Sequence, residues 1–570
     1  MKRAGVTLMA AGAIETSDEI MRAMNASSDD AGPPGATKAR TGSSPWAPFR
    51  SADFARMASA QFVSNVGGWM QTVGAQELML TLTTSATLVA LIQTAAGLPV
   101  VLLAVPAGAI GDLVDRRRLL IASQSFMLLA AALLAGLALA GSVTPLLLLA
   151  LIFAVGVGQT LTSPTWQTLQ PEVVAPEDRT QAIALGSVNQ NLSRAVGPAI
   201  GGALYAATSA GLLFVVNAVS FIPVIGAVAR WRGRERPASA VAPEHVVGAI
   251  RAGARYIASS PALRVILLRA GLFMLFANSI WALLPLVART RLHLGSGGYG
   301  LLLGGVGIGA VTGAALLPRL RQRVPATVLM TVGTLVFAGV TLALALVRVT
   351  ALDALVLVIG GVAWILVLST LNSQYQSTLP GWAKARGMSY YLVVFQGGGA
   401  LGSAAFGAVA QDAGLTGALL AAAIGLALVA LVGVWLPFKP ISPQDLLPAG
   451  DWPDPQLVGP AATAGPVLVT VEYRPRPGLE QELIAALYAG RYARRRTGAV
   501  SWRVWRDATD PGRVLEQFVV GSWEEHLRQH ERVSRRDQQR LEQIEAMIDP
   551  SHPTTVTHWL AAMADRNASS

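Results

Sequence analysis

A series of long apolar segments between Phe54 and Phe438 limits what this chain can fold into. A helix needs about 20 mostly apolar residues to cross a bilayer core of about 30 Å. Because hydrocarbon offers the backbone no hydrogen-bond partner, such a segment must satisfy its own peptide groups as a helix. Twelve segments qualify: 54–79, 84–110, 119–140, 144–168, 180–206, 209–230, 263–288, 297–318, 325–347, 352–379, 385–411 and 413–437. The sequence predicts an all-α membrane protein with twelve transmembrane helices, and not a soluble α/β protein.

Basic residues in the loops orient these helices. If the first helix starts in the cytoplasm, the short cytoplasmic loops hold nine Lys and Arg residues and the opposite loops hold three. Basic loops stay on the cytoplasmic side, so we expect a multi-pass protein of the inner (plasma) membrane with both termini cytoplasmic. The net charge of +11 has the same origin, because residues 466–570 contain fifteen Arg against fourteen Asp and Glu. The high charge therefore does not indicate nucleic-acid binding.

The chain carries a weak internal repeat. In residues 167–179 and again in 374–386, a Gln and an Arg stand twelve positions apart and join an apolar segment to a glycine-rich one. Two six-helix halves related by an axis along the membrane normal, with substrate bound between them, are one architecture of secondary transporters. The predicted parts are a disordered cytoplasmic leader (1–48), two six-helix bundles (49–237 and 238–440, the second preceded by a surface helix over 244–259), a linker (441–465) and a soluble domain (466–562).

A charged loop separates the second and third apolar segments. It reads Gly108-Ala-Ile-Gly-Asp112-Leu-Val-Asp115-Arg116-Arg117-Arg118, and it resembles the loop between the second and third helices of major facilitator superfamily transporters. The resemblance covers about residues 50–440, and within the superfamily the chain is similar to the branch of enterobactin-exporter-like proteins. The other residues that carry it are Ser64, Asn65, Gly67, Gly68, Trp69, Pro164, Gln167, Pro171, Asn372, Gln374, Pro380 and Arg386.

The resemblance implies that this loop is a gate. Asp112 is implied to lie against the N-terminus of a helix in the other half, which is the favourable end of a helix dipole for an anion. That contact would latch the outward-open state on the cytoplasmic side. Gly108, Asp115, Arg116 and Arg117 would complete the gating loop, although Asp115 stands where many members have glycine. The alternative is that the arginines only fix the topology.

The fifth segment contains the run Gly197-Pro198-Ala-Ile-Gly201-Gly202. Small residues at this spacing allow close helix contact, and the proline allows a local bend. The run resembles the end of a motif common in superfamily exporters that work as proton antiporters, although Ser193 stands where that motif has an upstream glycine. Plain tight packing is the alternative.

Ionisable groups at membrane depth are costly and are functional by default. Arg194 is a candidate for facing the transport path, unless it snorkels to the cytoplasmic surface. Glu77, the one acidic residue inside the first segment, is a candidate proton carrier, with an interfacial carboxylate as the alternative, and Arg269 is expected to be an anchor. Hydrogen bonding between helices explains the remaining candidates equally well. They are Asn189, Gln190, Asn191, Asn278, Trp281, Trp364, Asn372, Gln374 and Gln396.

Beyond the linker, the pattern changes to short strands and amphipathic helices. The predicted order is β-α-β-β-α-β, a split ferredoxin-like unit, with strands over 467–473, 501–506, 513–520 and 555–560 and helices over 479–492 and 523–548. This makes it a small α+β domain beside the helical membrane part. It resembles the dimeric α+β barrel domains of antibiotic-biosynthesis-type monooxygenases through Trp502, Arg506, Glu516, Ser522, Trp523, His526 and His530. The resemblance implies a homodimer in which two sheets pair face to face.

An enzyme fused to a transporter is the rival interpretation. Haem-degrading relatives are implied to use a histidine on the second helix and an asparagine on the first strand; His530 fits the histidine, but the strand has no asparagine. His526 and His530 lie one helical turn apart and could bind a metal, although such a pair is more often a solvated face. The chain has no cysteine and no flavin, nicotinamide or ATP-binding loop. We therefore expect no cofactor, no metal and no catalytic residue, and a dimerisation or regulatory role for this domain.

Together these patterns predict a secondary transporter that uses the proton gradient to export a small organic molecule by alternating access across the lipid bilayer. The cargo would be a siderophore, a metabolite or a drug. The alternatives are a multidrug efflux pump and a membrane-tethered, monooxygenase-like enzyme.

Overall fold

The structure is a computed structural model that describes residues 44–231, 246–438, 442–447 and 465–561. Most of the leader and the linker predicted from the sequence lies outside the described residues. The first half consists of α2 (Ala52–Leu82), α3 (Ala86–Leu113), α4 (Arg116–Leu139), α5 (Pro145–Leu169), α6 (Arg179–Ala207) and α7 (Ala210–Arg230). The second half consists of α8 (Val246–Ala258), α9 (Pro261–Leu286), α10 (Ser296–Arg323), α11 (Ala326–Leu346), α12 (Thr350–Ser377) and α13 (Lys384–Trp435).

Local sequence sets where several of these helices begin. The Ser51 side chain accepts a hydrogen bond from the Phe54 amide at the start of α2, and the Asp115 carboxylate accepts one from the Arg118 amide at the start of α4. Thr144 caps α5 in the same way. Such caps satisfy amides that have no partner within the helix, so the starts of these three helices are fixed by local residues.

Nine helices among the described residues are long and apolar enough to cross a membrane. Helices α2 and α6 have 31 and 29 residues, but polar side chains interrupt their apolar sequence and they are not among the nine. Helix α13 runs for 52 residues, with Gly414 at φ 76° and ψ 164° in its interior. A positive φ is a glycine conformation, and it falls beside the break predicted between 385–411 and 413–437.

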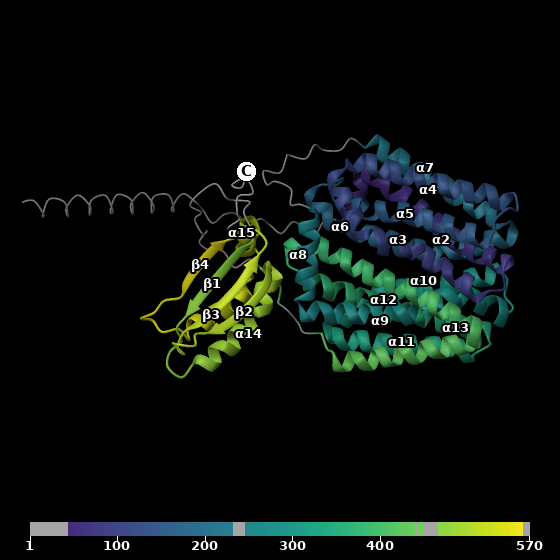
Figure 1. The fold of residues 1–570 in the computed structure, drawn as a ribbon. Coiled ribbons are helices and arrows are strands. Elements are labelled where there is room, and N and C mark those ends of the chain that lie inside the picture. Colours follow the sequence, from purple (N-terminus) through teal and green to yellow (C-terminus); the bar gives the residue numbers. More distant parts are fainter. Residues whose placement is uncertain (1–43, 232–245, 439–441, 448–464, 562–570) are drawn as a thin grey trace, which may run out of the picture.

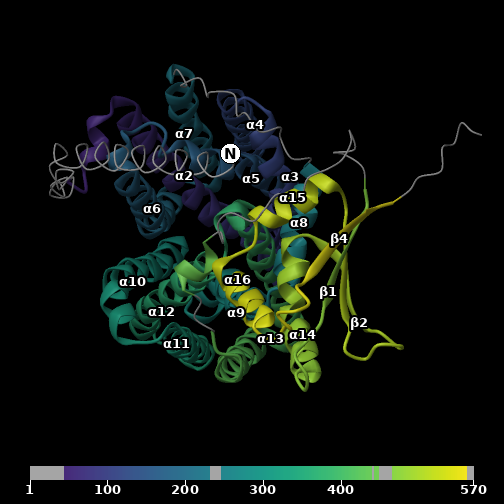
Figure 2. The same cartoon turned by 90° about the vertical axis from the view of Figure 1, so that its left-hand side faces the viewer.

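The long helices lie side by side, and the soluble domain lies at one end of them next to α8 (Figure 1). Viewed along the helices, α2, α4, α5, α6 and α7 form one group and α9 to α12 form another (Figure 2). The two groups contact each other mainly through α3 against α13 and α6 against α10. The surface helix predicted over 244–259 is present as α8, with Ala252, Tyr256 and Ile257 buried.

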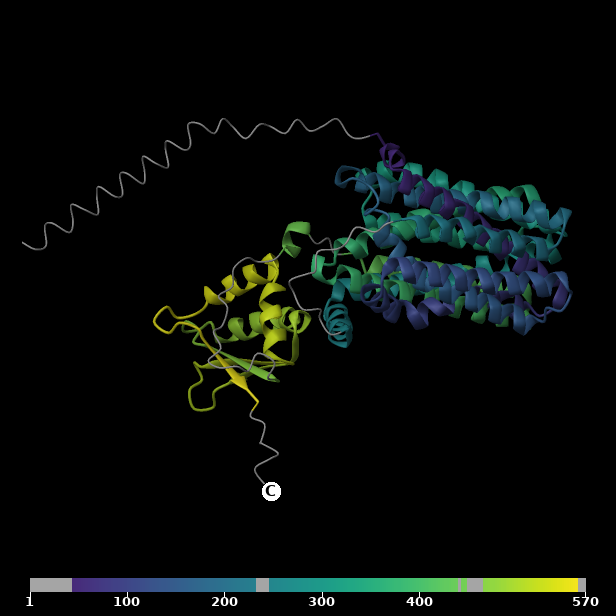
Figure 3. The same ribbon diagram turned by 90° about the horizontal axis from the view of Figure 1, so that it is seen from above.

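The soluble domain, called the tail from here on, has one four-stranded antiparallel sheet in the order β2-β3-β1-β4. Its helices lie on one side of that sheet (Figure 3). Alternate side chains of β1, including Val467 and Val469, pack with Leu483, Leu487 and Ile544 of the helices. The elements are β1 (Val467–Tyr473), α14 (Glu480–Thr497), β2 (Ala499–Arg506), β3 (Val514–Val520), α15 (Trp523–Glu531), α16 (Arg535–Glu545) and β4 (Thr555–Leu560).

The single helix predicted over 523–548 is wrong, because two helices occupy this stretch. The Ser534 hydroxyl caps the Asp537 amide, and the Asp537 carboxylate reaches back to the Ser534 amide. This reciprocal capping box starts a new helix. The capping box interrupts the apolar periodicity from which a single helix was predicted.

Candidate functional site

The glycine run of α6 lies where the two halves touch. A side chain on Gly197 would meet the Trp69 Cβ of α2 at 2.6 Å, and one on Gly201 would meet the Met70 Cα at 3.0 Å. On the other side, a Cβ on Gly202 would lie 2.8 Å from the Gly300 Cα of α10. Pro198 is buried inside the same helix. The predicted motif therefore packs α6 between α2 and α10 by backbone approach.

A polar contact joins the halves near the C-terminal end of α2, which the loop charges predict to face outward. The Gln76 side chain, which is fully buried, donates to the Trp281 carbonyl of α9 at 3.2 Å and accepts from the Tyr299 hydroxyl of α10. The neighbouring Glu77 carboxylate is 2% exposed and lies 3.8 Å from the Arg289 guanidinium. We call Gln76, Glu77, Arg289 and Tyr299 the outer latch. The sequence singled out Glu77 but missed its partners, because they lie in the other half.

Most of the other predicted path residues bond within their own half. Asn189 donates to the Ala58 carbonyl at 2.8 Å, and the Asn65 amide donates to the side-chain oxygens of Asn189 and Gln190. Asn278 donates to the Gly399 carbonyl at 2.9 Å. The alternative weighed for these residues, hydrogen bonding between helices, thus describes what three of them do.

The remaining candidates are spread over both halves. Asn372 is exposed and accepts from Gln376 one turn later, and Gln374 is half-buried. Gln396 and Asn191 are half-buried as well, and Gln396 lies 3.8 Å from a Cβ built on Gly97 of α3. These residues do not converge on one point.

Arg194 and three tryptophans form a second group that bridges the halves. The Arg194 guanidinium lies 5.5 Å from the Trp69 ring centre. Trp69 lies 6.3 Å from Trp281, and Trp281 lies 5.4 Å from Trp364, between ring centres. We call these four residues the arginine–tryptophan cluster. They come from α6, α2, α9 and α12, so no sequence window contains them together.

Three buried donors of this cluster lack partners in the described part of the chain. These are Nε of Arg194 and the indole nitrogens of Trp281 and Trp364. A buried donor without a partner costs free energy. Such groups are rare in native structures and can mark a functional position. The Nε atom of Arg269 lacks a partner among the described residues as well, but its terminal nitrogens donate to the Leu436 carbonyl and the Thr331 hydroxyl.

The gating loop is shorter than its sequence suggests. Helix α3 continues to Leu113, so only Val114 and Asp115 separate it from α4. The Asp112 side chain and the surroundings of Gly108 lie outside the described part of the chain. Arg116 pairs with Glu172 at 2.6 Å, and Arg117 donates to the Ala229 carbonyl. Both of these arginines are thus bonded within the first half.

A family model described as transmembrane secretion effector matches residues 43–567. The chain belongs to this family of major facilitator superfamily transporters. It is a transporter family and not an enzyme family, and the protein is therefore a multi-pass membrane transporter.

Similar proteins agree with this assignment. This chain is 29% identical to the staphyloferrin A transporter of Staphylococcus aureus over 165 residues. The matched segment covers 29% of this chain and 41% of that protein. The match thus spans about two fifths of that relative. A bacterial homologue of the human lysosomal transporter Spinster, in an inward-facing and occupied conformation, superposes with a TM-score of 0.54 at 16% identity, over 69% of this chain and 97% of that one. The nucleoside transporter NupG superposes with a TM-score of 0.56 at 13% identity, over 68% of this chain and 100% of that one. These two likenesses show the fold.

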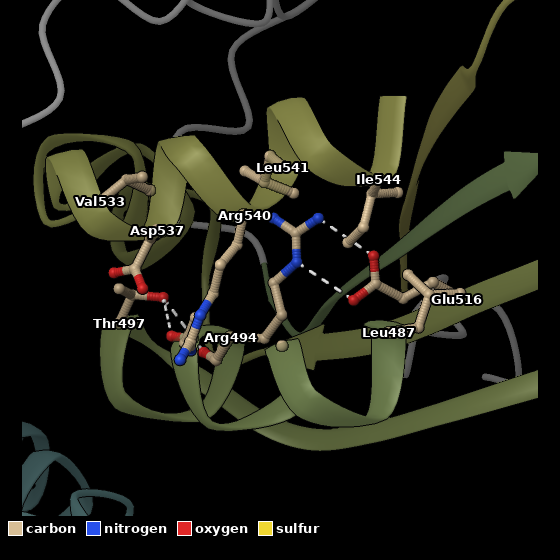
Figure 4. Close-up of a pocket in the computed structure, with 11 residues that line it drawn as sticks. Leu487, Arg494, Thr497, Glu516, Val533, Asp537, Arg540, Leu541 and Ile544 are labelled. Carbon is tan, nitrogen blue, oxygen red and sulfur yellow. Dashed lines mark hydrogen bonds and ion pairs between the residues drawn. The ribbon is translucent and has the colours of Figure 1, made fainter. Parts of the chain in front are cut away.

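The tail holds a buried ion pair between α14 and the sheet. Glu516 of β3 accepts hydrogen bonds from Arg494 at 3.0 Å, Tyr473 at 2.9 Å and Trp502 at 2.7 Å. Burial raises the pKa of Glu516, but the Arg494 guanidinium outweighs it and holds that pKa below its ordinary value. The neighbouring cavity between α14 and α16 measures about 30 Å³ (Figure 4). That is room for a water molecule.

A third histidine lies beside the two tail histidines that the sequence singled out. The His526 ring lies 4.7 Å from His530 and 4.8 Å from His558 of β4, between ring centres. Burial, with a smaller effect from His530, lowers the pKa of His526 to about 4. Among the described residues, no group of three has the geometry of a metal site. His526, the buried member of the three, is therefore neutral at ordinary pH.

The tail rests on the second half. Glu525 of α15 pairs with Arg255 of α8 at 3.1 Å, and the Arg532 guanidinium lies 4.7 Å from the Trp382 ring. Tyr256 of α8 packs edge-on against Trp382 at 5.3 Å. These contacts join the domain to residues at the cytoplasmic end predicted from the loop charges.

Proposed function

We propose that the protein is a twelve-span secondary exporter that moves a small organic molecule out of the cytoplasm by alternating access. Dividing α13 at Gly414 and adding α2 and α6 brings the nine apolar helices to twelve. The basic loops support a cytoplasmic position for both termini. The membrane is then the inner, or plasma, membrane.

The outer latch is the observation that carries this proposal. Gln76 and Glu77 of the first half bond to Trp281, Arg289 and Tyr299 of the second half. In alternating access, one repeat rocks against the other around a site near the midplane. A conformation whose halves meet at the outer end is the one that receives cargo from the cytoplasm, which is the loading state of an exporter.

Glu77 is the proposed proton carrier. As a carboxylate it attracts Arg289 across the two halves. When Glu77 takes up a proton, that attraction is lost, and the outer latch can open. Protons arriving from the outer side would therefore favour the outward-open state, and their release inside would reset the transporter. This order couples proton entry to cargo exit.

The other sequence motifs take places in this cycle. Arg194 would face the path, and Gly197, Gly201 and Gly202 would let α6 approach its neighbours and bend at Pro198. Asp112 would latch the cytoplasmic side when the transporter opens outward, supported by Asp115, Arg116 and Arg117. The similarity to a staphyloferrin A transporter supports a siderophore or a comparable metabolite as cargo.

The tail is proposed to be a ferredoxin-like dimerisation and regulatory domain. Its strand order and its helices on one side of the sheet fit that unit. The opposite side presents Trp505 beside Leu515 and Trp559 beside Leu468, with the tryptophans 46% and 57% exposed. A second copy would cover these rings. Catalysis is disfavoured because Arg494 and Glu516 occupy the space between α14 and the sheet.

Export is tested by untargeted mass spectrometry of cells and spent medium. Wild type, a deletion strain and strains carrying Glu77→Gln or Asp53→Asn are grown with and without iron. Asp53 is the matched control, because it is a half-exposed carboxylate on the same helix that pairs with Arg56 one turn away. We expect one compound to be retained by the deletion and Glu77→Gln strains but not by Asp53→Asn.

The proposal fails if no compound is retained in either medium. A set of unrelated foreign drugs that accumulates instead would indicate a multidrug efflux pump. Turnover by the tail, without any change in transport, would point to the enzyme.

A further inference from the structure

The arginine–tryptophan cluster contains a positive charge that the described protein does not neutralise. Arg194 stands near the middle of α6, which runs from Arg179 to Ala207. It forms no ion pair with a carboxylate of the described residues, and its Nε atom has no hydrogen-bond partner there. A cation at this depth is costly and marks a substrate or ion path by default.

Arg269 shows what a structural arginine looks like in the same bundle. Its guanidinium donates to the Leu436 carbonyl and the Thr331 hydroxyl, both at 3.4 Å, and lies 4.3 Å from the Phe438 ring centre. The protein itself thus accommodates that charge. Among the described residues, the Arg194 guanidinium lies against the Trp69 ring and has no hydrogen-bond acceptor. Unlike those of Arg269, its terminal nitrogens are therefore available to a bound group.

The neighbouring groups are donors as well. The indole nitrogens of Trp281 and Trp364 are buried without an acceptor in the described part of the chain, and they come from the half opposite Arg194. A guanidinium and two indole N–H groups can only be satisfied by acceptor atoms. A ligand with a single negative charge matches the charge of the cluster, because a second negative charge would have no counter-cation there.

We infer that the transported molecule is an organic anion whose carboxylate binds Arg194 and whose planar, unsaturated body packs against Trp69, Trp281 and Trp364. This inference rests on the proposed transport function and names its substrate class. A planar guanidinium pairs with a carboxylate through two parallel hydrogen bonds, and indole rings favour aromatic partners. Because the four residues come from both halves, binding of the anion draws the halves together, as occlusion requires.

The test measures binding of 1-naphthoate to the full-length protein in lipid nanodiscs, with 1-naphthamide as the neutral probe of the same shape. We expect naphthoate to bind roughly tenfold more tightly than naphthamide, since charge-assisted hydrogen bonds are about twice as strong as neutral ones. Arg194→Gln should remove that preference, and Arg194→Lys should retain most of it. Arg348→Gln, which deletes an exposed charge in the loop before α12, is the matched control and should change nothing.

Several results would overturn the inference. These are equal binding of the two probes, undiminished naphthoate binding by Arg194→Gln, or no naphthoate binding by wild type at millimolar concentration. The melting temperature without probe must match wild type. Arg194→Gln should meet this condition because it breaks no ion pair among the described residues. A retained compound that is neutral or cationic would refute the anion while export stands. If no compound is retained, export fails and the binding result is still read on its own.

Discussion

Replacing Gly307 with alanine should open the outer end of the transporter. Gly307 lies on α10 where a Cβ would overlap the Ala195 Cα of α6, so the two halves cannot keep their present contact. Overpacking of this kind costs about 1–3 kcal/mol. That cost falls on the outward-closed state, and it lowers the ratio of closed to open protein by roughly 5- to 150-fold. Gly297→Ala on the same helix is the matched control, because a Cβ there meets nothing within 4 Å.

The absence of cysteine provides the assay. Cysteines at Ala86 and Gln411, whose backbone amide and side-chain oxygen lie 2.8 Å apart between α3 and α13, are joined with a short bifunctional thiol reagent in membranes. The initial rate of cross-linking reports the closed fraction. We expect Gly307→Ala to slow it by at least fivefold relative to Gly297→Ala. Equal rates in the two variants, with equal expression, would refute the account of how the halves meet.

Three further predictions concern the tail. Glu516→Gln leaves Arg494 buried without a counter-charge and should destabilise the tail by about 3–5 kcal/mol, read as an earlier thermal transition in the full-length protein. The low folded pKa of His526 means that the unfolded chain binds the proton first. Tail stability should therefore fall between about pH 6.5 and pH 4, by on the order of 3 kcal/mol, and level off below; His526→Gln should flatten that profile, and a pH-independent wild type would contradict it. Trp505→Asp with Trp559→Asp should convert a dimer in detergent to a monomer by light scattering, and an unchanged mass would remove the sheet as the interface.

The sequence predicts most of the membrane helices, because the bilayer imposes length and apolarity on each of them separately. It also places the last break correctly, since Gly414 adopts a positive φ beside the predicted boundary. The errors are local. Helix α3 extends to Leu113 through the expected loop, and the Ser534 cap divides a helix that periodicity joined. The hydrogen bonds of the Ser534 cap decide a boundary that the apolar pattern does not encode.

The candidate site was predictable only in part. Arg194 and Glu77 stand out because charge is rare in apolar segments, and that argument needs no partner. Their neighbours could not be found in this way, because Arg289 and Tyr299 belong to the opposite half and an ordinary Gln76 carries no signal. In the sequence, Asn189 and Asn278 cannot be told apart from residues that line a transport path. In the structure, their side chains donate to backbone carbonyls of adjacent helices.

The attachment of the tail has a mechanical consequence. Arg255 and Trp382, which hold it, both belong to the second half, so the tail must travel with that half as one body. If two tails pair through their open sheets, two second halves are fastened into a common frame. Each first half would then swing against that frame on its own. A change that strengthens or weakens the Glu525–Arg255 contact would then alter the transport rate of both copies. It would do so without contacting either transport path.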